Sequence, residues 1–271
     1  MSRHRVKPDS RVDLASIDPN ETSGYDGSDG KANAKTKTDT LIEKLARLQD
    51  RLYANAGRSL LIILQGMDTS GKDGTIKHVM SGVNPMGCHV RSFKVPTPQE
   101  RAHDFLWRVH QQVPAAGYIG IFNRSHYEDV LVTRVHEQIG KKEAERRFAQ
   151  IRDFERLLNE HGTAILKFFL HISNDEQRER LEERVKDKEK RWKFSANDLA
   201  ERKLWSKYQA MYEAAIAATS TTEAPWFIVP ANRKWYRNLV VAETVVEALE
   251  AMNLKTPPAS PDIDFKNLKI S

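Results

Sequence analysis

Apolar residues gather in five short runs, and the segments between the runs repeat apolar positions at helical spacing. The runs are rich in Ile, Leu, Val and Phe; they span residues 60–64, 118–122, 164–172 and 226–229, with a weaker run at 89–93. Short continuous apolar runs are typical of strands that are buried on both faces. The pattern therefore predicts five strands of a parallel sheet.

The intervening segments predict helices that cover the sheet. Leu41, Leu45, Leu48 and Leu52 recur at helical spacing over residues 41–54. Six further helical stretches are expected at residues 75–80, 99–113, 141–160, 175–186, 196–218 and 233–252. Strands that alternate with helices indicate a three-layer α/β domain, with helices on both faces of the sheet.

The two ends of the chain differ from this domain. Residues 1–40 hold few apolar side chains and a series of lysines, Lys31, Lys35 and Lys37. Such a stretch buries too little surface to offset the entropy of ordering, so we expect a flexible arm. We expect one folded domain over residues 41–256 and a tail over residues 257–271.

Composition excludes several classes of protein. The 271 residues include 43 Lys and Arg against 37 Asp and Glu, a formal net charge of +6. No apolar run approaches the roughly 20 residues of a membrane helix, and the charged start lacks the apolar core of a secretory signal. The single cysteine, Cys88, makes no internal disulfide and predicts a cytoplasmic location. The basic excess suits either a polyanionic partner or an ordinary enzyme.

The strongest motif directly follows the first predicted strand. Residues 66–75 read GMDTSGKDGT, in which Gly66, Gly71 and Lys72 have the spacing of a Walker A loop. Glycines let backbone N–H groups surround a phosphate, and the next helix adds positive potential. Asp73 stands where Ser or Thr is usual, and Asp68 beside phosphate requires a cation between them. The predicted phosphate-binding residues here are Gly66, Thr69, Ser70, Gly71, Lys72, Asp73, Gly74 and Thr75.

A second polar cluster follows the strand at 118–122. Ligands of open α/β sheets bind beyond the carboxyl ends of the strands, so we expect this cluster to face the phosphate loop. Asn123 occupies the position of a Walker B carboxylate, and the predicted metal ligands are Asp68, Asn123, Glu128 and Asp129. Arg124 either clamps a phosphoryl group or forms a salt bridge with Glu128 or Asp129. His126 is expected to pack or hydrogen-bond rather than to act as a base.

Residues 178–195 are strongly charged, and their position matches the mobile helical lid of nucleotide kinases. The alternative is an ordinary solvated helix with i,i+4 ion pairs. In a lid, Arg184 and Arg191 are the best candidates to point inward. Residues 93–98, after the second strand, are expected beside the acceptor nucleotide.

Together these motifs resemble the family-2 polyphosphate kinases. The resemblance rests on GMDTSGKDGT, on FNRSHYED at 122–129, on residues 178–193 and on APWFIVPANRKWYRNL at 224–239. It implies a P-loop kinase fold that exchanges a terminal phosphoryl group between inorganic polyphosphate and a nucleotide, with magnesium or manganese. Its catalytic positions fall on Asp68, Lys72, Asn123, Arg124 and Arg184.

The resemblance also implies substrates and assembly. Asn123 with Glu128 and Asp129 is similar to the subgroup that phosphorylates both AMP and ADP, yielding ADP and ATP. It implies neither a nucleic-acid nor a membrane partner, and relatives commonly form dimers or tetramers, so we expect a homo-oligomer. A polyphosphate chain needs a long basic track, for which the further candidates are Lys77, Arg91, Lys94, Arg134, Arg184, Arg191 and Lys193.

Two alternative functions share these features. An ATP-dependent nucleotide or nucleoside kinase would use the same fold and loop. A non-catalytic polyanion binder with a degenerate loop would account for Asn123 and Asp73.

Overall fold

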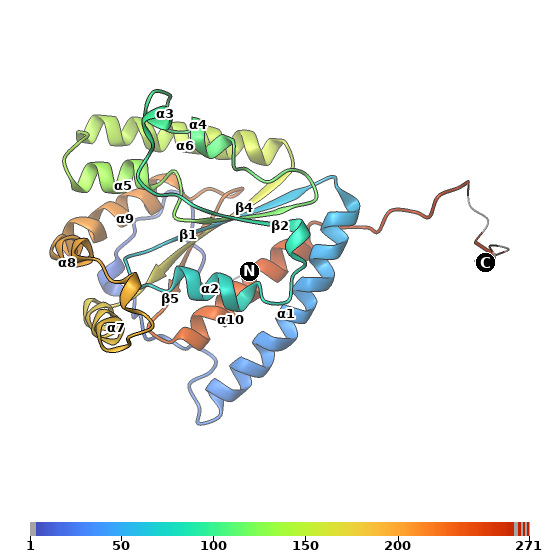
Figure 1. Ribbon diagram of the computed structural model, residues 1–271, viewed down its shortest axis with the longest axis horizontal. Helices are drawn as coiled ribbons and strands as arrows, with labels where there is room; N and C mark the ends of the chain where they lie inside the picture. The colour runs from blue at the N-terminus through green and yellow to red at the C-terminus, as the bar shows by residue number, and fades with distance from the viewer. Residues whose placement is uncertain (1–3, 263–264, 267, 269, 271) are drawn as a thin grey trace.

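The computed structural model of the protein describes residues 4–262, 265–266, 268 and 270, and a five-stranded parallel sheet lies at its centre (Figure 1). The strands are β1 (Ser59–Gln65), β2 (Cys88–Ser92), β3 (Ile119–Asn123), β4 (Thr163–His171) and β5 (Trp226–Pro230). Their order in the sheet is β2-β3-β1-β4-β5, and every pairing is parallel. The five predicted strands are confirmed, each to within one residue at either end.

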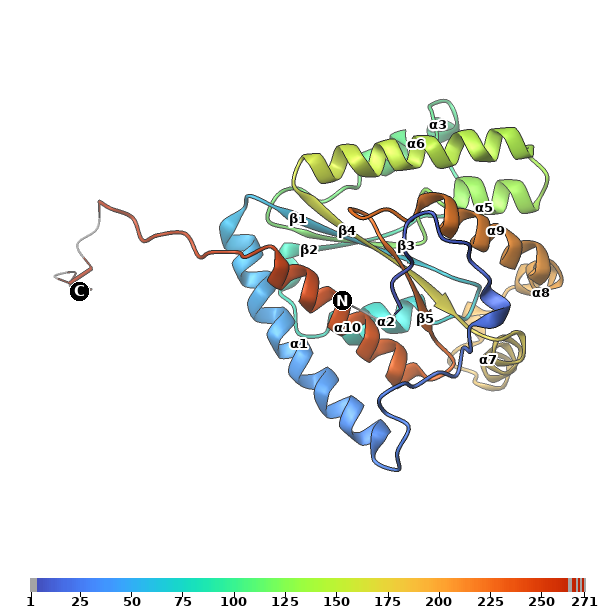
Figure 2. The same cartoon turned by 180° about the vertical axis from the view of Figure 1, so that it is seen from behind.

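Helices cover both faces of the sheet, as predicted. Figures 1 and 2 show α1, α2 and α10 on one face and α5, α6 and α9 on the other. The helices are α1 (Gly30–Asn55), α2 (Lys72–Val79), α3 (Pro98–Arg101), α4 (Trp107–His110), α5 (Glu128–Val135), α6 (Lys141–Glu160), α7 (Asn174–Lys186), α8 (Ala196–Lys203), α9 (Trp205–Thr219) and α10 (Lys234–Ala251). Short 3₁₀ turns lie at Leu14–Ser16, Pro85–Gly87 and Arg191–Lys193.

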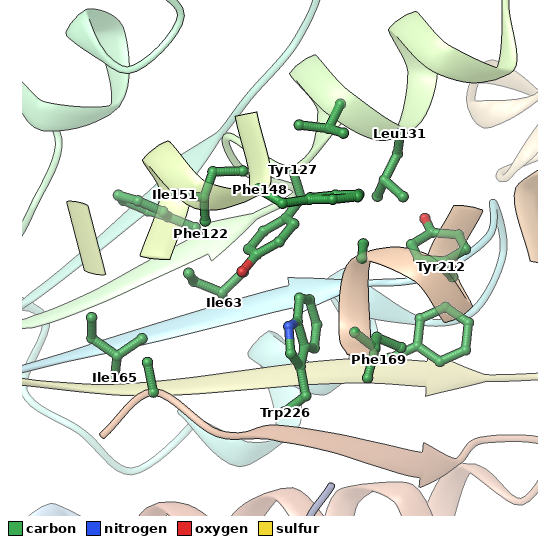
Figure 3. Close-up of a cluster of buried hydrophobic side chains, with 14 of the residues drawn as sticks. Ile63, Phe122, Tyr127, Leu131, Phe148, Ile151, Ile165, Phe169, Tyr212 and Trp226 are labelled. Carbon is green, nitrogen blue, oxygen red and sulfur yellow. The ribbon is translucent and has the colours of Figure 1, made fainter. Parts of the chain in front are cut away.

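The central strand β1 divides the core into two clusters. Leu60, Ile62 and Leu64 belong to the cluster beneath α1 and α10, whereas Leu61 and Ile63 belong to the cluster beneath α5, α6 and α9. This alternation is the two-residue period of a strand, with both faces apolar. Figure 3 shows the second cluster. The continuous apolar run at 60–64 therefore serves two layers at once.

A buried polar group within the second cluster anchors the turn after β3. The Lys167 ammonium donates to Glu155 Oε2 at 2.5 Å, and the Tyr127 hydroxyl donates to Glu155 Oε1 at 2.9 Å. His126 Nε2 lies 3.3 Å from the same carboxylate oxygen, and its side chain is fully buried. His126 thus has the hydrogen-bonding role expected of it, and residues 126–127 hold the adjacent Asn123–Arg124 segment in place.

The N-terminal segment differs from the expected flexible arm over residues 1–40. From residue 4 onward it packs on the domain: Arg5 bridges Phe227 in antiparallel fashion, Val6 N donates to the Trp226 carbonyl at 2.8 Å, and Leu14 is buried. The segment thereby covers the β5 edge of the sheet (Figure 2). Backbone pairing with an edge strand requires few apolar side chains, so composition did not reveal it.

Helix α1 begins eleven residues before the predicted start at Leu41. Its buried stripe continues backward through Thr38 and Ala34, and the Thr38 hydroxyl donates to the Ala34 carbonyl at 2.7 Å. Both side chains are small and lie on the buried side of the helix, which packs on α10, but no large apolar residue marks this part of the stripe in the sequence. The folded domain therefore includes residues that we had assigned to the arm.

Two predicted helices are divided in the structure. The stretch at 99–113 separates into α3 and α4 because the Asp104 carboxylate accepts hydrogen bonds from the backbone N–H groups of Leu106 and Trp107. The stretch at 196–218 divides at Leu204, between α8 and α9. Helix α5 was not predicted, since the polar motif before it obscured its short apolar stripe.

Past α10 the chain extends away from the domain (Figure 1), and residues 257–262 are exposed. Part of the predicted tail, at 263–264, 267, 269 and 271, lies outside the described residues. Among the described helices, none combines the length and the apolar character that a bilayer crossing requires.

Candidate active site

The phosphate loop joins β1 to α2 at the centre of the sheet. Gly66 and Gly71 have φ values of +145° and +102°, a region that side chains with a Cβ rarely adopt. A Cβ on Gly71 would also lie 1.9 Å from Arg237 Nη1. Both glycines are therefore required by the backbone path, which explains the spacing seen in the sequence.

Lys72 is folded back onto this loop. Its ammonium donates to the carbonyls of Gly66 at 2.7 Å and Met67 at 3.2 Å. Burial, aided by the nearby positive charge of Arg124, lowers the pKa of Lys72 to about 8. A polyanion bound beside Lys72 would raise this pKa again. The ammonium would then exchange its hydrogen bonds to the two carbonyls for hydrogen bonds to phosphate oxygens.

Two hydroxyls in the loop are buried without partners. Among the described residues, neither Thr69 Oγ1 nor Ser70 Oγ finds a hydrogen-bond partner. Leaving a buried hydroxyl unsatisfied costs free energy, which a ligand can recover. A phosphate oxygen would accept hydrogen bonds from both. By contrast, the Thr75 hydroxyl is already used, since it donates to the Gly71 carbonyl at 3.0 Å.

Arg124 connects the phosphate loop to the cluster after β3. Its guanidinium donates to Asp68 Oδ1 at 2.6 Å and to Glu128 Oε2 at 3.3 Å. Glu128 and Asp68 raise the pKa of Arg124 above its ordinary value. Burial raises the pKa of Glu128 in spite of the neighbouring cation. The salt bridge with Glu128 that the sequence suggested for Arg124 is thus present. The clamp on a phosphoryl group stays a prediction, for a side chain that lines the cavity.

Asn123 lies beside the first turn of α2. Its Nδ2 donates to Asp73 Oδ1 at 2.6 Å, and Asp73 in turn faces Lys193 of the segment after α7, with 3.8 Å between Oδ2 and Nζ. The unusual Asp73 of the Walker A pattern therefore links the loop to β3 and to the predicted lid.

A cavity of about 560 Å³ opens beside these groups. The loop residues Gly66 and Asp68 form one wall, and Arg124 and Glu128 form another. Lys94 and Val95, from the segment expected beside the nucleotide, also line it, as do Tyr208, Tyr212 and the α8 residues Asn197 and Asp198. Its size and mixed lining suit a small organic anion.

The structure brings part of the predicted lid to this cavity. Arg184 lies 3.8 Å from Asp198, which lines the cavity. Arg191 instead donates to the Val185 carbonyl at 2.7 Å and is exposed, so it does not point inward as expected.

Several other predicted residues lie apart from the phosphate loop. Asp129, expected as a metal ligand, is paired with Arg108 at 2.8 Å, because α5 turns its side chain toward α4. Arg134 lies in the last turn of α5, where its charge helps to lower the pKa of Glu137. Neither side chain contacts the phosphate loop, although Asp129 also lines the cavity beside it. Arg91 is exposed on the edge strand β2, and Lys77 is exposed in the last turn of α2.

Two buried arginines hold the loop, and neither is among the residues predicted for the site. Arg180 of α7 donates from Nη1 to the Thr69 carbonyl at 2.8 Å and from Nη2 to the Ala231 carbonyl at 2.7 Å. Arg237 of α10 approaches the Ser70 carbonyl at 3.4 Å. Both lie in charged or polar stretches, where only tertiary packing separates a buried arginine from an exposed one.

Arg180→Ala should lower the free energy of unfolding by about 3 kcal/mol, since it leaves buried carbonyls without donors. Urea denaturation measures this change. The matched control is Arg178→Ala on the same helix, whose exposed pairing with Asp175 is worth little. Equal midpoints for the two variants would show that Arg180 does not secure the loop.

The geometry defines a class of protein: an α/β phosphotransferase of the P-loop type, with a glycine-lysine cradle, an arginine bridged to two carboxylates and an adjoining cavity. Comparison with known proteins makes the assignment specific. The family model for polyphosphate kinase 2 matches residues 28–257. The chain belongs to the polyphosphate kinase 2 family.

Individual relatives are similar over nearly the whole chain. An AMP/ADP-polyphosphate phosphotransferase of Meiothermus ruber is 53% identical over 257 residues, covering 95% of this chain and 96% of the relative. An ADP-polyphosphate phosphotransferase of Rhodopseudomonas palustris is 45% identical, covering 82% and 81%. The crystal structure of polyphosphate kinase 2 from Arthrobacter aurescens superimposes with a TM-score of 0.92 at 46% identity, covering 97% of this chain and 93% of that one.

Proposed function

We propose that the protein transfers the terminal phosphoryl group between inorganic polyphosphate and AMP or ADP, forming ADP or ATP, in a reversible reaction. The observation that carries the proposal is the pair of unpartnered hydroxyls at Thr69 and Ser70, next to the Lys72 ammonium and the Asp68–Arg124–Glu128 group. The 53% identical relative, named for both AMP and ADP, supports the choice of acceptors.

Magnesium fits the donor set of the site. Mg²⁺ is usually held by one or two carboxylates together with substrate phosphates. Asp68 and Glu128 supply two carboxylates, both paired with the Arg124 guanidinium. Among the described residues, no group of three or more His, Cys, Asp or Glu could hold a metal ion without help from the substrate. In the proposal Asp68 and Glu128 hold the ion, which supplies charge neutralisation between the phosphates.

The chain's own residues account for the remaining requirements. Lys72 and the loop N–H groups would bind the transferring phosphoryl group, and Arg124 would offset the charge that shifts during transfer. An anionic acceptor phosphate needs no general base, which agrees with a fully buried His126. Closure of residues 178–195, bearing Arg184 and Lys193, would exclude water from the cavity.

An ATP-free assay tests the proposal. The protein is incubated with polyphosphate, magnesium and either AMP or ADP, and product nucleotides are separated by chromatography. We expect ADP and ATP from AMP, and ATP from ADP. If products form only when ATP is the donor, the protein is the ATP-dependent kinase considered above. If nothing turns over while polyphosphate binds, it is the non-catalytic binder.

Asn123→Asp should change the magnesium dependence of the reaction. The substitution replaces the amide donor to Asp73 by a carboxylate 2.6 Å away, which adds negative charge and a hard oxygen ligand beside the loop. We expect the magnesium concentration for half-maximal rate to shift severalfold. An unchanged metal titration would show that Asn123 does not face the ion.

The proposal extends to location and assembly. A cytoplasmic enzyme agrees with a chain whose single cysteine is free. We also propose a homo-oligomer, either a dimer or a tetramer, as is expected from the family. Light scattering on the purified protein measures the assembly, and a monomer at all concentrations would contradict it.

A further inference from the structure

Helix α7 holds three consecutive carbonyls of the phosphate loop. Gln177 Nε2 donates to the Asp68 carbonyl at 3.1 Å. One turn later, Arg180 Nη1 donates to the carbonyls of Thr69 at 2.8 Å and Ser70 at 3.1 Å. Thr69 has a φ of +65°, a left-handed conformation that is uncommon for a residue with a Cβ and that persists where its surroundings hold it. The face of α7 that carries Gln177 and Arg180 therefore supports the strained part of the loop.

A second hydrogen bond of Gln177 fixes the orientation of its buried amide. Its Oε1 accepts from Arg202 Nη1 of α8 at 2.8 Å. A guanidinium only donates and a backbone carbonyl only accepts, so a single orientation of the amide satisfies Arg202 and the Asp68 carbonyl together. Without Arg202, the amide would be free to rotate and to turn Oε1 toward the Asp68 carbonyl, where two oxygens repel each other. Arg202 thus determines which atom of Gln177 meets the loop.

Arg202 is itself anchored on the first residue of α7. Its Nη1 donates to the Asn174 carbonyl at 2.7 Å, and its Nη2 donates to Asn174 Oδ1 at 2.6 Å. Helices α7 and α8 lie together at the end of the sheet toward which the strands point (Figures 1 and 2). Asn197, Asp198 and Glu201 of α8 line the cavity beside the loop. Neighbouring residues of α8 therefore face the cavity and the support of the loop.

Asp68 joins this line of contacts to the group proposed to act in phosphoryl transfer. Its carbonyl accepts from Gln177, and its carboxylate accepts from Arg124 Nη2 at 2.6 Å. Both groups belong to one residue, so a shift of the Asp68 backbone moves the carboxylate relative to Arg124. A misplacement of about 1 Å in such a group costs up to about a hundredfold in rate. The contacts run without a gap from α8 through α7 and the loop to Arg124.

We propose that Gln177 and Arg202 are positioning residues: Arg202 orients the Gln177 amide, and Gln177 holds Asp68 in place for phosphoryl transfer. The helix that lines the nucleotide cavity is thereby coupled to the phosphate loop. The proposal rests on the proposed function. Neither side chain lines the cavity, so both act through Asp68 rather than on the substrate. The alternative is that the two residues only join α7 to α8, in which case their loss affects stability and not turnover.

A double-mutant cycle with polyphosphate and ADP tests this order of action. Gln177→Met keeps the length of the side chain but loses both hydrogen bonds, and it should lower kcat about tenfold. KM for ADP should stay within about twofold, because the cavity walls do not change. Arg202→Met should lower kcat about fivefold, since the amide then holds its productive orientation for only part of the time. Added to Gln177→Met, it should lower kcat no further, because Arg202 acts through Gln177.

Gln177→Glu separates positioning from the joining of the two helices. Its carboxylate still accepts from Arg202, so α7 and α8 stay connected, but it presents an oxygen instead of a donor to the Asp68 carbonyl. We expect a loss of kcat at least as large as in Gln177→Met. The matched control is Lys203→Met, at the next and exposed residue of α8, which should keep the wild-type kcat. A wild-type kcat in Gln177→Glu overturns the proposal.

Hydrogen exchange of the loop provides a measurement that does not depend on turnover. The backbone N–H groups of residues 66–75 should exchange faster in Gln177→Met and in Arg202→Met than in Lys203→Met. If the wild type shows no turnover with polyphosphate, the proposed function fails, while hydrogen exchange still decides whether the two side chains hold the loop. Losses of kcat that add in the double variant, or equal exchange in all three variants, contradict the proposal. So does a lower urea midpoint with an unchanged kcat.

Discussion

Replacing Lys72 with methionine should lower kcat/KM for polyphosphate-dependent phosphorylation by about a thousandfold, because it removes the charge directed at the transferring group. Methionine keeps the length of the side chain, so the loop should retain its path around Gly66 and Gly71. Initial-rate kinetics with ADP and polyphosphate measure the loss. A Lys72→Met enzyme within tenfold of the wild type would place the transferring phosphoryl group elsewhere.

The wild-type enzyme should show the matching pH dependence. Burial lowers the pKa of Lys72 to about 8, so the free enzyme carries the charged lysine below that pH and loses it above. We therefore expect kcat/KM to decline as pH rises through about 8. Bound phosphates favour the charged form, so the decline in kcat should occur at higher pH.

Lys72→Arg serves as the control for this assignment. Arginine stays charged throughout the range, so the decline in kcat/KM near pH 8 should disappear even though the rate is lower. If the decline persists unchanged in Lys72→Arg, another group causes it. The same sign governs stability: a lysine that binds its proton less tightly in the folded state destabilises it below pH 8, and this cost disappears as pH rises toward the ordinary value of 10.5.

The sheet and the phosphate loop could be predicted because local patterns determine them. A run such as residues 60–64 is apolar at every position only when both faces of the strand are buried, and Gly66 and Gly71 lie where the backbone takes φ values that a Cβ resists. The same logic placed Asn123 and Arg124 at the carboxyl edge of the sheet, beside the loop. In these cases the residues next to each other in the sequence are sufficient to determine the local structure.

The features that the sequence did not reveal concern side chains whose partners are distant along the chain. Asp129 and Glu128 are adjacent in sequence, but one turn of α5 directs Glu128 to Arg124 and Asp129 to Arg108. Arg180 and Arg184 share one helix, yet Arg180 is buried against the loop whereas Arg184 lies beside the cavity. The N-terminal segment was misjudged for a related reason, since its edge pairing with β5 is made by backbone groups that composition ignores.

Replacing Arg124 with alanine should lower kcat by about two to three orders of magnitude, comparable to the removal of one preorganised donor that stabilises developing charge. Two effects combine. The transferring group loses a cation, and Asp68 and Glu128 lose the guanidinium that both contact, at 2.6 and 3.3 Å. Arg124→Lys keeps one charge but not the planar fork that spans two carboxylates, so its loss should be intermediate.

The measurements separate a catalytic from a structural Arg124. The side chain is 41% exposed, so the ion pairs themselves should contribute little to stability, and Arg124→Ala should unfold within about 1 kcal/mol of the wild type. Added guanidinium should restore part of the lost rate in Arg124→Ala and none in Lys72→Met. If Arg124→Ala is strongly destabilised yet turns over at a near-normal rate, Arg124 forms only a structural salt bridge. The charge beside the transferring phosphoryl group would then have to come from Arg184 or Lys193 on closure of the lid.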